Sequence, residues 1–189
     1  MDDRARRAPV LAGLAPSSRP ELLDVRDAGP AVRLAFRGSP AAAEALRAVF
    51  GIALPGTPCR AASSGERHAL WLGPDEWLLI GPDGDPSAFA AMLAGAVVIL
   101  PHSLVDVSHR SAALRLSGSG VTDILNAGCP LDLDITAFPV GMCARTLLGK
   151  AEVVLWRIAP LSFHLEVARS YISYVTALLR GAEIAYQHA

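Results

Sequence analysis

Two dipeptides, Ser39-Pro40 and Asp85-Pro86, mark the starts of two helices in the first half of the chain. A Ser or Asp side chain caps the free amides of a helix N-terminus, and proline fits the first helical position because its ring presets φ there. The first helix is predicted over residues 41–50, since Gly51 supplies the left-handed residue that ends it, and the second runs to Gly95. The fold must therefore place strands around these two helices.

Apolar runs between and around these helices predict the strands of the first half. Residues 55–65, rich in Pro and Gly, are expected to be a loop. The expected strands are residues 32–36, then 68–72 and 77–80 as a hairpin, then 97–100 and 104–107 as short buried strands. The order strand, helix, two strands, helix, strand is a split β-α-β arrangement of the ferredoxin-like kind, with helices on one face of an antiparallel sheet.

The second half runs through a similar order. Its expected elements are a strand at 113–116, a helix capped by Ser119 and ended by Gly128, a loop at 131–138, a hairpin of 142–148 with 152–158, a strand at 161–167, a helix capped by Ser170, and a closing strand at 183–186. We therefore predict an α+β fold of two related split β-α-β halves with antiparallel sheets. Residues 1–30 would be an extended N-terminal arm, and residues 31–189 a single domain with halves 31–107 and 108–189.

The composition is compatible with a well-packed monomer and with an obligate subunit. Hydrophobic residues make up 52% of the chain, and the mean hydropathy is +0.36. An obligate subunit would also be this apolar, because its interface resembles a core cut in half. The longest apolar run, residues 88–100, falls short of the roughly 20 residues that a membrane-spanning helix needs. The net charge of −1 provides no basic face, so we expect neither a membrane nor a nucleic acid as partner.

The cysteines and histidines do not form a recognisable metal or redox pattern. The three cysteines, Cys59, Cys129 and Cys143, are widely spaced, and no secretory hydrophobic region opens the chain. The five histidines occur singly, without the spacing of metal ligands. We expect a cytoplasmic location, with the cysteines acting as small hydrophobic residues.

The segment Asp106-Val107-Ser108-His109-Arg110 contains the three residue types of a hydrolase triad. On a strand, Asp106 and Ser108 share one face while His109 points to the other, so the three side chains cannot bond to one another. We expect Asp106 and Ser108 to tie down the strand end through side-chain to backbone hydrogen bonds. No catalytic residue is assigned.

Two tryptophans flank the turn of the predicted hairpin, in Leu70-Trp71-Leu72-Gly73-Pro74-Asp75-Glu76-Trp77-Leu78-Leu79. Trp71 and Trp77 either point into the core or provide an aromatic anchor for a partner, since tryptophan is favoured at interface hot spots. The adjacent carboxylates of the turn are not suited to acid–base work, because no apolar pocket would separate their pKa values.

Five segments together resemble the gamma subunit of heterotetrameric sarcosine oxidase over roughly residues 30–185. They are the tryptophan hairpin at 70–79, the Asp106–Arg110 segment, Gly128-Cys129-Pro130-Leu131-Asp132-Leu133, Arg145-Thr146, and the run from Phe163 through Val167 to Arg169-Ser170. The Asp-Val-Ser-His segment, followed by a strand and Ser117-Gly118, is also similar to the folate-binding fold of the glycine-cleavage T-protein.

This resemblance implies an assembly of alpha, beta, gamma and delta subunits that demethylates sarcosine oxidatively. The products would be glycine, hydrogen peroxide, and formaldehyde or methylene-tetrahydrofolate. FAD, FMN, NAD and tetrahydrofolate would belong to the alpha and beta subunits, and this chain would hold no cofactor and no metal. Its main partner would be the alpha subunit, with Trp71, Trp77, Arg110 and Arg145 as candidate contacts.

This sequence lacks the catalytic segments of two related families, which also favours a subunit without a cofactor. The paired aspartates that carry catalysis in the T-protein have no counterpart, and neither does the cysteine segment of the folate-binding iron–sulfur maintenance proteins. The region corresponding to that segment is residues 139–145, where Cys143 is expected in the core. Two hypotheses remain: a structural subunit that docks on the alpha subunit, or a free-standing folate-binding aminomethyltransferase-like protein. A redox or metal enzyme is the weaker third.

Overall fold

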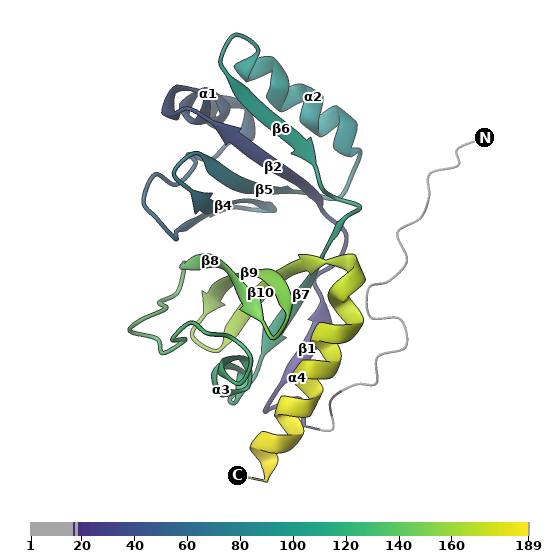
Figure 1. Cartoon of the computed structure of the whole chain (residues 1–189). Coiled ribbons are helices and arrows are strands. Elements are labelled where there is room, and N and C mark those ends of the chain that lie inside the picture. Colours follow the sequence, from purple (N-terminus) through teal and green to yellow (C-terminus); the bar gives the residue numbers. More distant parts are fainter. Residues whose placement is uncertain (1–16, 18, 189) are drawn as a thin grey trace, which may run out of the picture.

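The computed structural model describes Ser17 and residues 19–188, which form two five-stranded antiparallel sheets with helices packed on them (Figure 1). The first sheet has the order β3 (Ala61–Ser64), β4 (Arg67–Gly73), β5 (Glu76–Gly81), β2 (Val32–Gly38) and β6 (His102–Asp106). The second has the order β1 (Asp24–Asp27), β7 (Ser111–Ser117), β10 (Ser162–Ala168), β9 (Ala151–Ala159) and β8 (Cys143–Leu148). The predicted α+β class and the two related halves are confirmed.

The helices of the first half begin where the capping dipeptides predict. Helix α1 (Pro40–Phe50) begins after Ser39, whose hydroxyl accepts a hydrogen bond from the Ala42 amide. The helix ends at Gly51, which has a φ of 80°. Helix α2 (Pro86–Val97) begins after Asp85, whose carboxylate accepts a hydrogen bond from the Ser87 amide. Local capping chemistry therefore suffices to place both starts.

The two sheets face each other, and the helices lie on their outer sides. Helices α1 and α2 pack on the first sheet, and α3 (Val121–Asn126) and α4 (Ile172–Gln187) pack on the second (Figure 1). A third cluster lies between the sheets and is built from strand residues of both, among them Leu70, Leu78 and Trp156. Each central strand thus buries both faces, one against helices and one against the opposite sheet.

The N-terminal strand β1 replaces the closing strand that the sequence pattern predicted. Residues 183–186 continue α4 instead of forming a strand, so that prediction is wrong. Strand β1 pairs with β7 at the sheet edge equivalent to the one that β6 occupies beside β2 in the first sheet. Residues 24–27, assigned to the arm, therefore belong to the second sheet, and Leu23 is buried in its core. Residues 1–16 and 18 of the arm lie outside the described residues.

Several other expectations are wrong for local reasons. Residues 97–100 are not a strand: Val97 ends α2, and Val98 and Ile99 are 76% and 89% exposed. Strand β6 is mostly exposed rather than buried, because it is an edge strand with a single neighbour. Strand β3 lies in the expected loop 55–65.

The two predicted serine caps in the second half are also absent. Helix α3 has Gly120 at its cap position, and the Ser119 hydroxyl instead donates to the Glu21 carbonyl, which holds the approach to β1. Helix α4 is preceded by a 3-10 turn, Arg169–Tyr171, and its cap position is Tyr171 rather than Ser170. Within the described part of the chain, no helix is long and apolar enough to cross a membrane.

Candidate functional site: the cleft between the two sheets

A cleft of about 360 Å³ opens between the two sheets at one end of their shared interior. Its apolar wall includes Ala35 and Leu78 from the first sheet and Val154 from the second. Its charged lining includes three glutamates and two arginines, from strands of both sheets and from the turn before β7: Glu76, Glu152, Glu166, Arg110 and Arg145. The cleft is therefore the place where the two halves bring ionisable groups together.

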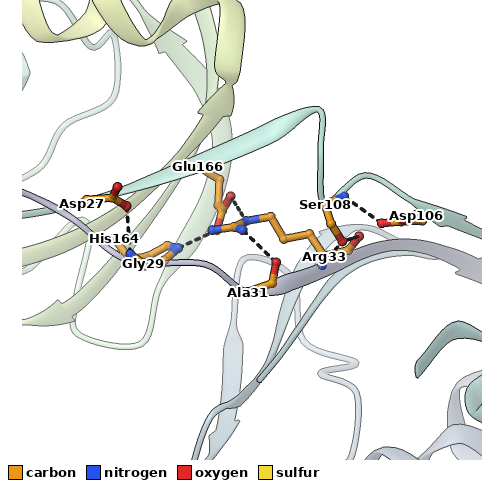
Figure 2. Close-up of polar contacts among 8 residues, drawn as sticks. All are labelled: Asp27, Gly29, Ala31, Arg33, Asp106, Ser108, His164 and Glu166. Atoms are coloured by element: carbon orange, nitrogen blue, oxygen red, sulfur yellow. Dashed lines mark hydrogen bonds and ion pairs between the residues drawn. The ribbon is translucent and has the colours of Figure 1, made fainter. Parts of the chain in front are cut away.

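Glu166, which lines the cleft, belongs to a buried cluster of three charged or titratable side chains together with Arg33 and His164 (Figure 2). Arg33 Nε donates to Glu166 Oε2 at 2.6 Å, and His164 Nε2 lies 2.8 Å from Glu166 Oε1. The Arg33 and Glu166 side chains are only 3% and 4% exposed. Because Arg33 belongs to β2 and the other two to β10, this cluster links the first sheet to the second.

Strand alternation explains why these polar groups point inward. In β2, Val32 and Leu34 face the helices, so Arg33 between them faces the opposite sheet. In β10, Phe163 and Leu165 face α3 and α4, so His164 and Glu166 point the other way. The cluster thus lies in the layer between the sheets, where a lone charge would carry a large desolvation cost.

Ser108 completes the support of the cluster from the segment between β6 and β7. The Arg33 amide donates to Ser108 Oγ at 2.9 Å, and the Ser108 amide donates to Asp106 Oδ1 at 2.8 Å (Figure 2). The prediction that Asp106 and Ser108 tie down the strand end is confirmed. His109, by contrast, is exposed.

The electrostatics of the cluster keep Glu166 ionised. Burial by itself raises the pKa of Glu166, but the hydrogen bond and charge of His164, together with Arg33, outweigh burial and lower it. The carboxylate therefore acts as a fixed negative charge between two donors. A general acid or base needs a pKa near the working pH, which this arrangement prevents.

A second ionic group lies nearer the mouth of the cleft, around Glu76. Its carboxylate accepts from Arg145 of β8 and, at 2.6 Å, from Arg37 of β2. The side chain of Glu76 is 13% exposed, so the carboxylate is largely enclosed although it follows an exposed turn. The hydrogen bond from Arg145 and then that from Arg37 lower the pKa of Glu76 against the opposing effect of burial. Arg145 thereby joins the two sheets within the chain.

We expect Arg145→Met to raise the pKa of Glu76 toward its ordinary 4.5 by more than Arg37→Met does, because the Arg145 hydrogen bond is the larger cause of the lowering. The measurement is a carboxyl-carbon NMR titration of each variant. The pKa of Glu76 is lower in the folded chain than in the unfolded chain. The ionised carboxylate therefore stabilises the fold above about pH 4.5, and this contribution is lost as the pH falls through the pKa of the folded chain. Equal shifts in the two variants would contradict the asymmetry.

The two tryptophans have different surroundings. Trp77 is 4% exposed, packs on Phe36, and donates its indole N–H to the Pro55 carbonyl at 2.8 Å. It is a core residue of the first half, as the first of its two interpretations predicted. Trp71, opposite Trp77 across the hairpin, is half-buried and packs at the edge of the same cluster.

The two predicted arginines also differ. Arg145 is engaged with Glu76, as described above. Arg110 is exposed at the cleft, and among the described residues its guanidinium forms no ion pair within 4 Å. The structure thus brings Arg110 and Arg145 to one cleft and leaves Trp71 and Trp77 on the first sheet.

Two further titratable groups, His68 and Cys143, act through packing. The His68 ring stacks near Trp156 at a centroid distance of 5.1 Å, and burial, then the charges of His164 and Arg115, lowers the pKa of His68. Burial raises the pKa of the Cys143 thiol to about 12. Within residues 17 and 19–188, no group of three His, Cys, Asp or Glu side chains is placed to hold a metal ion.

Sequence reasoning missed Arg33, Glu166, His164 and Glu76 as members of one site. A signal was present, since Arg33 interrupts the apolar run Val32–Phe36 and Glu166 and His164 interrupt Phe163–Val167. Charged residues inside a strand that is buried on both faces imply a partner. The pairing of one strand with the other depends on the sheets facing each other, which no local pattern states.

Comparison with known proteins places the chain in a family. A family model described as "Sarcosine oxidase, gamma subunit family" matches residues 36–185. The chain belongs to this family. This gamma-family chain is 34% identical over 165 residues to a sarcosine oxidase subunit gamma from Arthrobacter sp, a match that covers 84% of the chain and 80% of that relative. It is 32% identical over 183 residues to the subunit gamma of Corynebacterium sp. (strain P-1), covering 94% of the chain and 89% of the relative.

Solved structures extend the likeness of this gamma-family chain to the fold. A chain of the heterotetrameric sarcosine oxidase from Corynebacterium sp. U-96, solved with pyrrole 2-carboxylate, is 27% identical and superposes with a TM-score of 0.86 over 97% of both chains. The glycine cleavage aminomethyltransferase T from Bartonella henselae is 14% identical, with a TM-score of 0.65 over 84% of this chain and 45% of that one. At that identity the likeness shows the fold alone, and it confirms the T-protein-like architecture.

Proposed function

We propose that this chain is a non-catalytic structural subunit of a heterotetrameric sarcosine oxidase and that it docks on the alpha subunit. The beta and delta subunits complete the assembly, which acts in the cytoplasm. The complex converts sarcosine to glycine, with formaldehyde or methylene-tetrahydrofolate and hydrogen peroxide as further products. The single observation that carries this proposal is the family match over residues 36–185, together with the near-complete superposition on a chain of a heterotetrameric enzyme.

The chemistry of the cleft supports a structural role. Glu166 is held between Arg33 and His164, and Glu76 between Arg37 and Arg145, so each carboxylate is paired on both sides. Both pKa values are lowered away from neutrality, which suits ion pairing and not proton transfer near pH 7. In this proposal FAD, FMN, NAD and tetrahydrofolate belong to the alpha and beta subunits, and the gamma cleft links its own two halves.

The surface supports an obligate partner. Large apolar side chains stand exposed on several elements, the most exposed being Val98 and Ile99 after α2, Ile184 on α4, and Val105 on β6. In this proposal these side chains contribute to the contacts with the partner subunits, since contiguous exposed apolar patches mark protein–protein contacts. Among the residues singled out from the sequence, Trp71 and Arg110 remain the proposed partner contacts, and Arg145 contributes through its position at the cleft mouth.

The proposal predicts that tagged chain, expressed with the alpha, beta and delta genes of its own source, co-purifies with a flavin-containing complex. The complex should produce hydrogen peroxide when sarcosine is added, whereas the chain purified alone should contain no flavin and show no turnover. Size-exclusion chromatography with a flavin absorbance trace and a peroxidase-coupled assay are the two readouts. Absence of a flavin partner from the tagged preparation would rule the proposal out.

Two further arms sharpen this test. Arg110→Glu should reduce co-purification of the flavin subunits by at least about tenfold, because a reversed charge at a docking surface repels its partner. Arg47→Glu is the matched control, since Arg47 is an exposed arginine on α1 far from the cleft. Calorimetric titration of the isolated chain with tetrahydrofolate tests the aminomethyltransferase-like alternative, for which micromolar binding with turnover is the expected result.

A further inference from the structure

The backbones of Cys59 and Cys143 lie opposite each other where the edge of the first sheet meets the edge of the second. The Cys143 amide donates to the Cys59 carbonyl at 3.0 Å, and the Ala61 amide donates to the Gly141 carbonyl at 2.9 Å. Between these bonds, Arg60 and Met142 form an isolated antiparallel bridge. Cys59 lies just before β3 and Cys143 begins β8, so this short ladder connects the two halves at their edge strands.

The backbone geometry at this junction fits a disulfide. Residues opposite each other on an antiparallel ladder, when joined by a hydrogen bond, have Cα atoms about 5.5 Å apart, and disulfides span Cα separations of roughly 4.4–6.8 Å. Cys59 is also among the causes that raise the pKa of Cys143, after burial. Both thiols are free in the structure, which therefore shows the pair in its reduced form.

The two cysteines have unequal access to solvent. Cys143 is fully buried between the sheets, and its thiol donates to the Trp71 carbonyl at 3.6 Å. Cys59 is half-buried, and it is the one non-glycine residue with positive φ, 58°, among those the structure describes. A left-handed backbone is unfavourable for cysteine, and such strain is concentrated at functional positions. Cys59 is therefore the residue that a small oxidant reaches first, with Cys143 behind it.

We infer that Cys59 and Cys143 are a reversible dithiol that hydrogen peroxide oxidises to a disulfide, which clasps the first sheet to the second. The site rests on the geometry of this chain, whereas the local source of peroxide and the reducing compartment rest on the proposed function. Disulfides in reduced compartments are typically transient and redox-responsive, as this one would be.

The oxidation balances in two steps. The Cys59 sulfur attacks one peroxide oxygen, the O–O bond breaks, and Cys59 becomes a sulfenic acid as one water leaves. The Cys143 sulfur then attacks the Cys59 sulfur, the S–O bond breaks, and the hydroxyl leaves as a second water with the proton of the Cys143 thiol. Two thiols are oxidised to one disulfide while one peroxide is reduced to two waters.

The test treats the purified full-length chain with stoichiometric hydrogen peroxide, under conditions that keep it monomeric. Titratable thiols should fall from three to one, and the intact mass should fall by two hydrogen atoms. Peptide mapping without reductant should place the bond between Cys59 and Cys143, and a dithiol reductant should reverse it. The oxidised chain should unfold about 5–15 °C higher than the reduced one, because the bond closes a long loop.

Cys129 is the internal control, because it is buried beside Thr146 and has no facing cysteine. Cys59→Ser should abolish the mass change, whereas Cys143→Ser should leave Cys59 as a sulfenic acid that dimedone traps. The wild-type peptide map decides the matter even if a variant fails to fold. Sulfinic acid at Cys59 with Cys143 still reduced, or only intermolecular disulfides, would overturn the inference.

A second arm separates this inference from the proposed function. The chain in its co-purified complex receives sarcosine and oxygen in place of added peroxide, with catalase in a parallel sample. Formation of the same disulfide, suppressed by catalase, supports both proposals. If added peroxide forms the bond and sarcosine does not, the dithiol stands and the proposed local source of peroxide is wrong.

Discussion

Replacing Glu166 with leucine should lower the free energy of unfolding by about 3–5 kcal/mol, because the change leaves the Arg33 guanidinium buried without its counter-charge. Arg33 is 3% exposed, and its Nε atom bonds to Glu166 at 2.6 Å, so the variant removes the charged partner of a nearly inaccessible guanidinium. The His164 ring would also lose its acceptor on the same carboxylate. Pulse proteolysis of the full chain across a urea series measures the loss at low protein concentration.

The double variant Arg33→Met/Glu166→Leu is the matched control for this prediction. Removing both charges at once leaves no isolated ion in the layer between the sheets, so most of the lost stability should return. The coupling energy in the double-mutant cycle should reach roughly 2 kcal/mol. Additive losses would mean that the ion pair does not hold the two sheets together and that each side chain acts only through its own packing.

The pH dependence of the same pair has a definite sign. The pKa of Glu166 in the folded chain lies below its ordinary 4.5, so the ionised carboxylate is favoured by folding. Its contribution is complete above about pH 4.5 and disappears as the pH falls through the folded pKa. The stability difference between wild type and Glu166→Leu should therefore shrink in acid and stay constant toward neutral pH.

Gly118→Ala should lower the free energy of unfolding by about 3–5 kcal/mol, since the change combines a strained backbone with a steric overlap. Gly118 has φ of 130°, a conformation that side chains rarely adopt. A Cβ atom there would overlap the carbonyl oxygen of Leu22 and lie 2.9 Å from the Leu23 amide nitrogen. Both are backbone atoms of the segment that leads into β1, so the segment itself would have to move.

The expected structural consequence is release of β1 from the edge of the second sheet. The Ser119 and Gly120 amides hold the Glu21 and Leu22 carbonyls at 2.9 and 3.0 Å, and any shift of this loop breaks those bonds. Hydrogen exchange should accelerate at Asp24–Asp27 and along β7, with little change in the first sheet. Urea unfolding gives the total loss.

Gly65→Ala separates strain from overlap. Gly65 also has positive φ, 58°, but a Cβ atom there would meet no heavy atom within 4 Å. Gly65→Ala should lower the free energy of unfolding by only about 1 kcal/mol, the usual penalty for alanine in a left-handed conformation. Equal losses at the two positions would show that contact with Leu22 is not what makes Gly118 necessary.

Local chemistry was sufficient to predict much of this fold. Ser39-Pro40 and Asp85-Pro86 placed the starts of α1 and α2, and the turn between Trp71 and Trp77 predicted the β4–β5 hairpin, because caps and turns depend on a few adjacent residues. The same locality explains the errors. Ser119 has the chemistry of a cap, yet its hydroxyl bonds to Glu21, a residue 98 positions away.

What the sequence alone determined is the α+β class, the two similar halves, the gamma-subunit resemblance, and the role of Asp106 and Ser108 at a strand end. The tertiary structure decided that β1 completes the second sheet in place of a C-terminal strand, and that Trp77 is core. It alone brought Arg33 to Glu166, and Cys59 to Cys143. The physical reason is that these pairs form only when two sheets face each other, a long-range arrangement that no local periodicity or cap encodes.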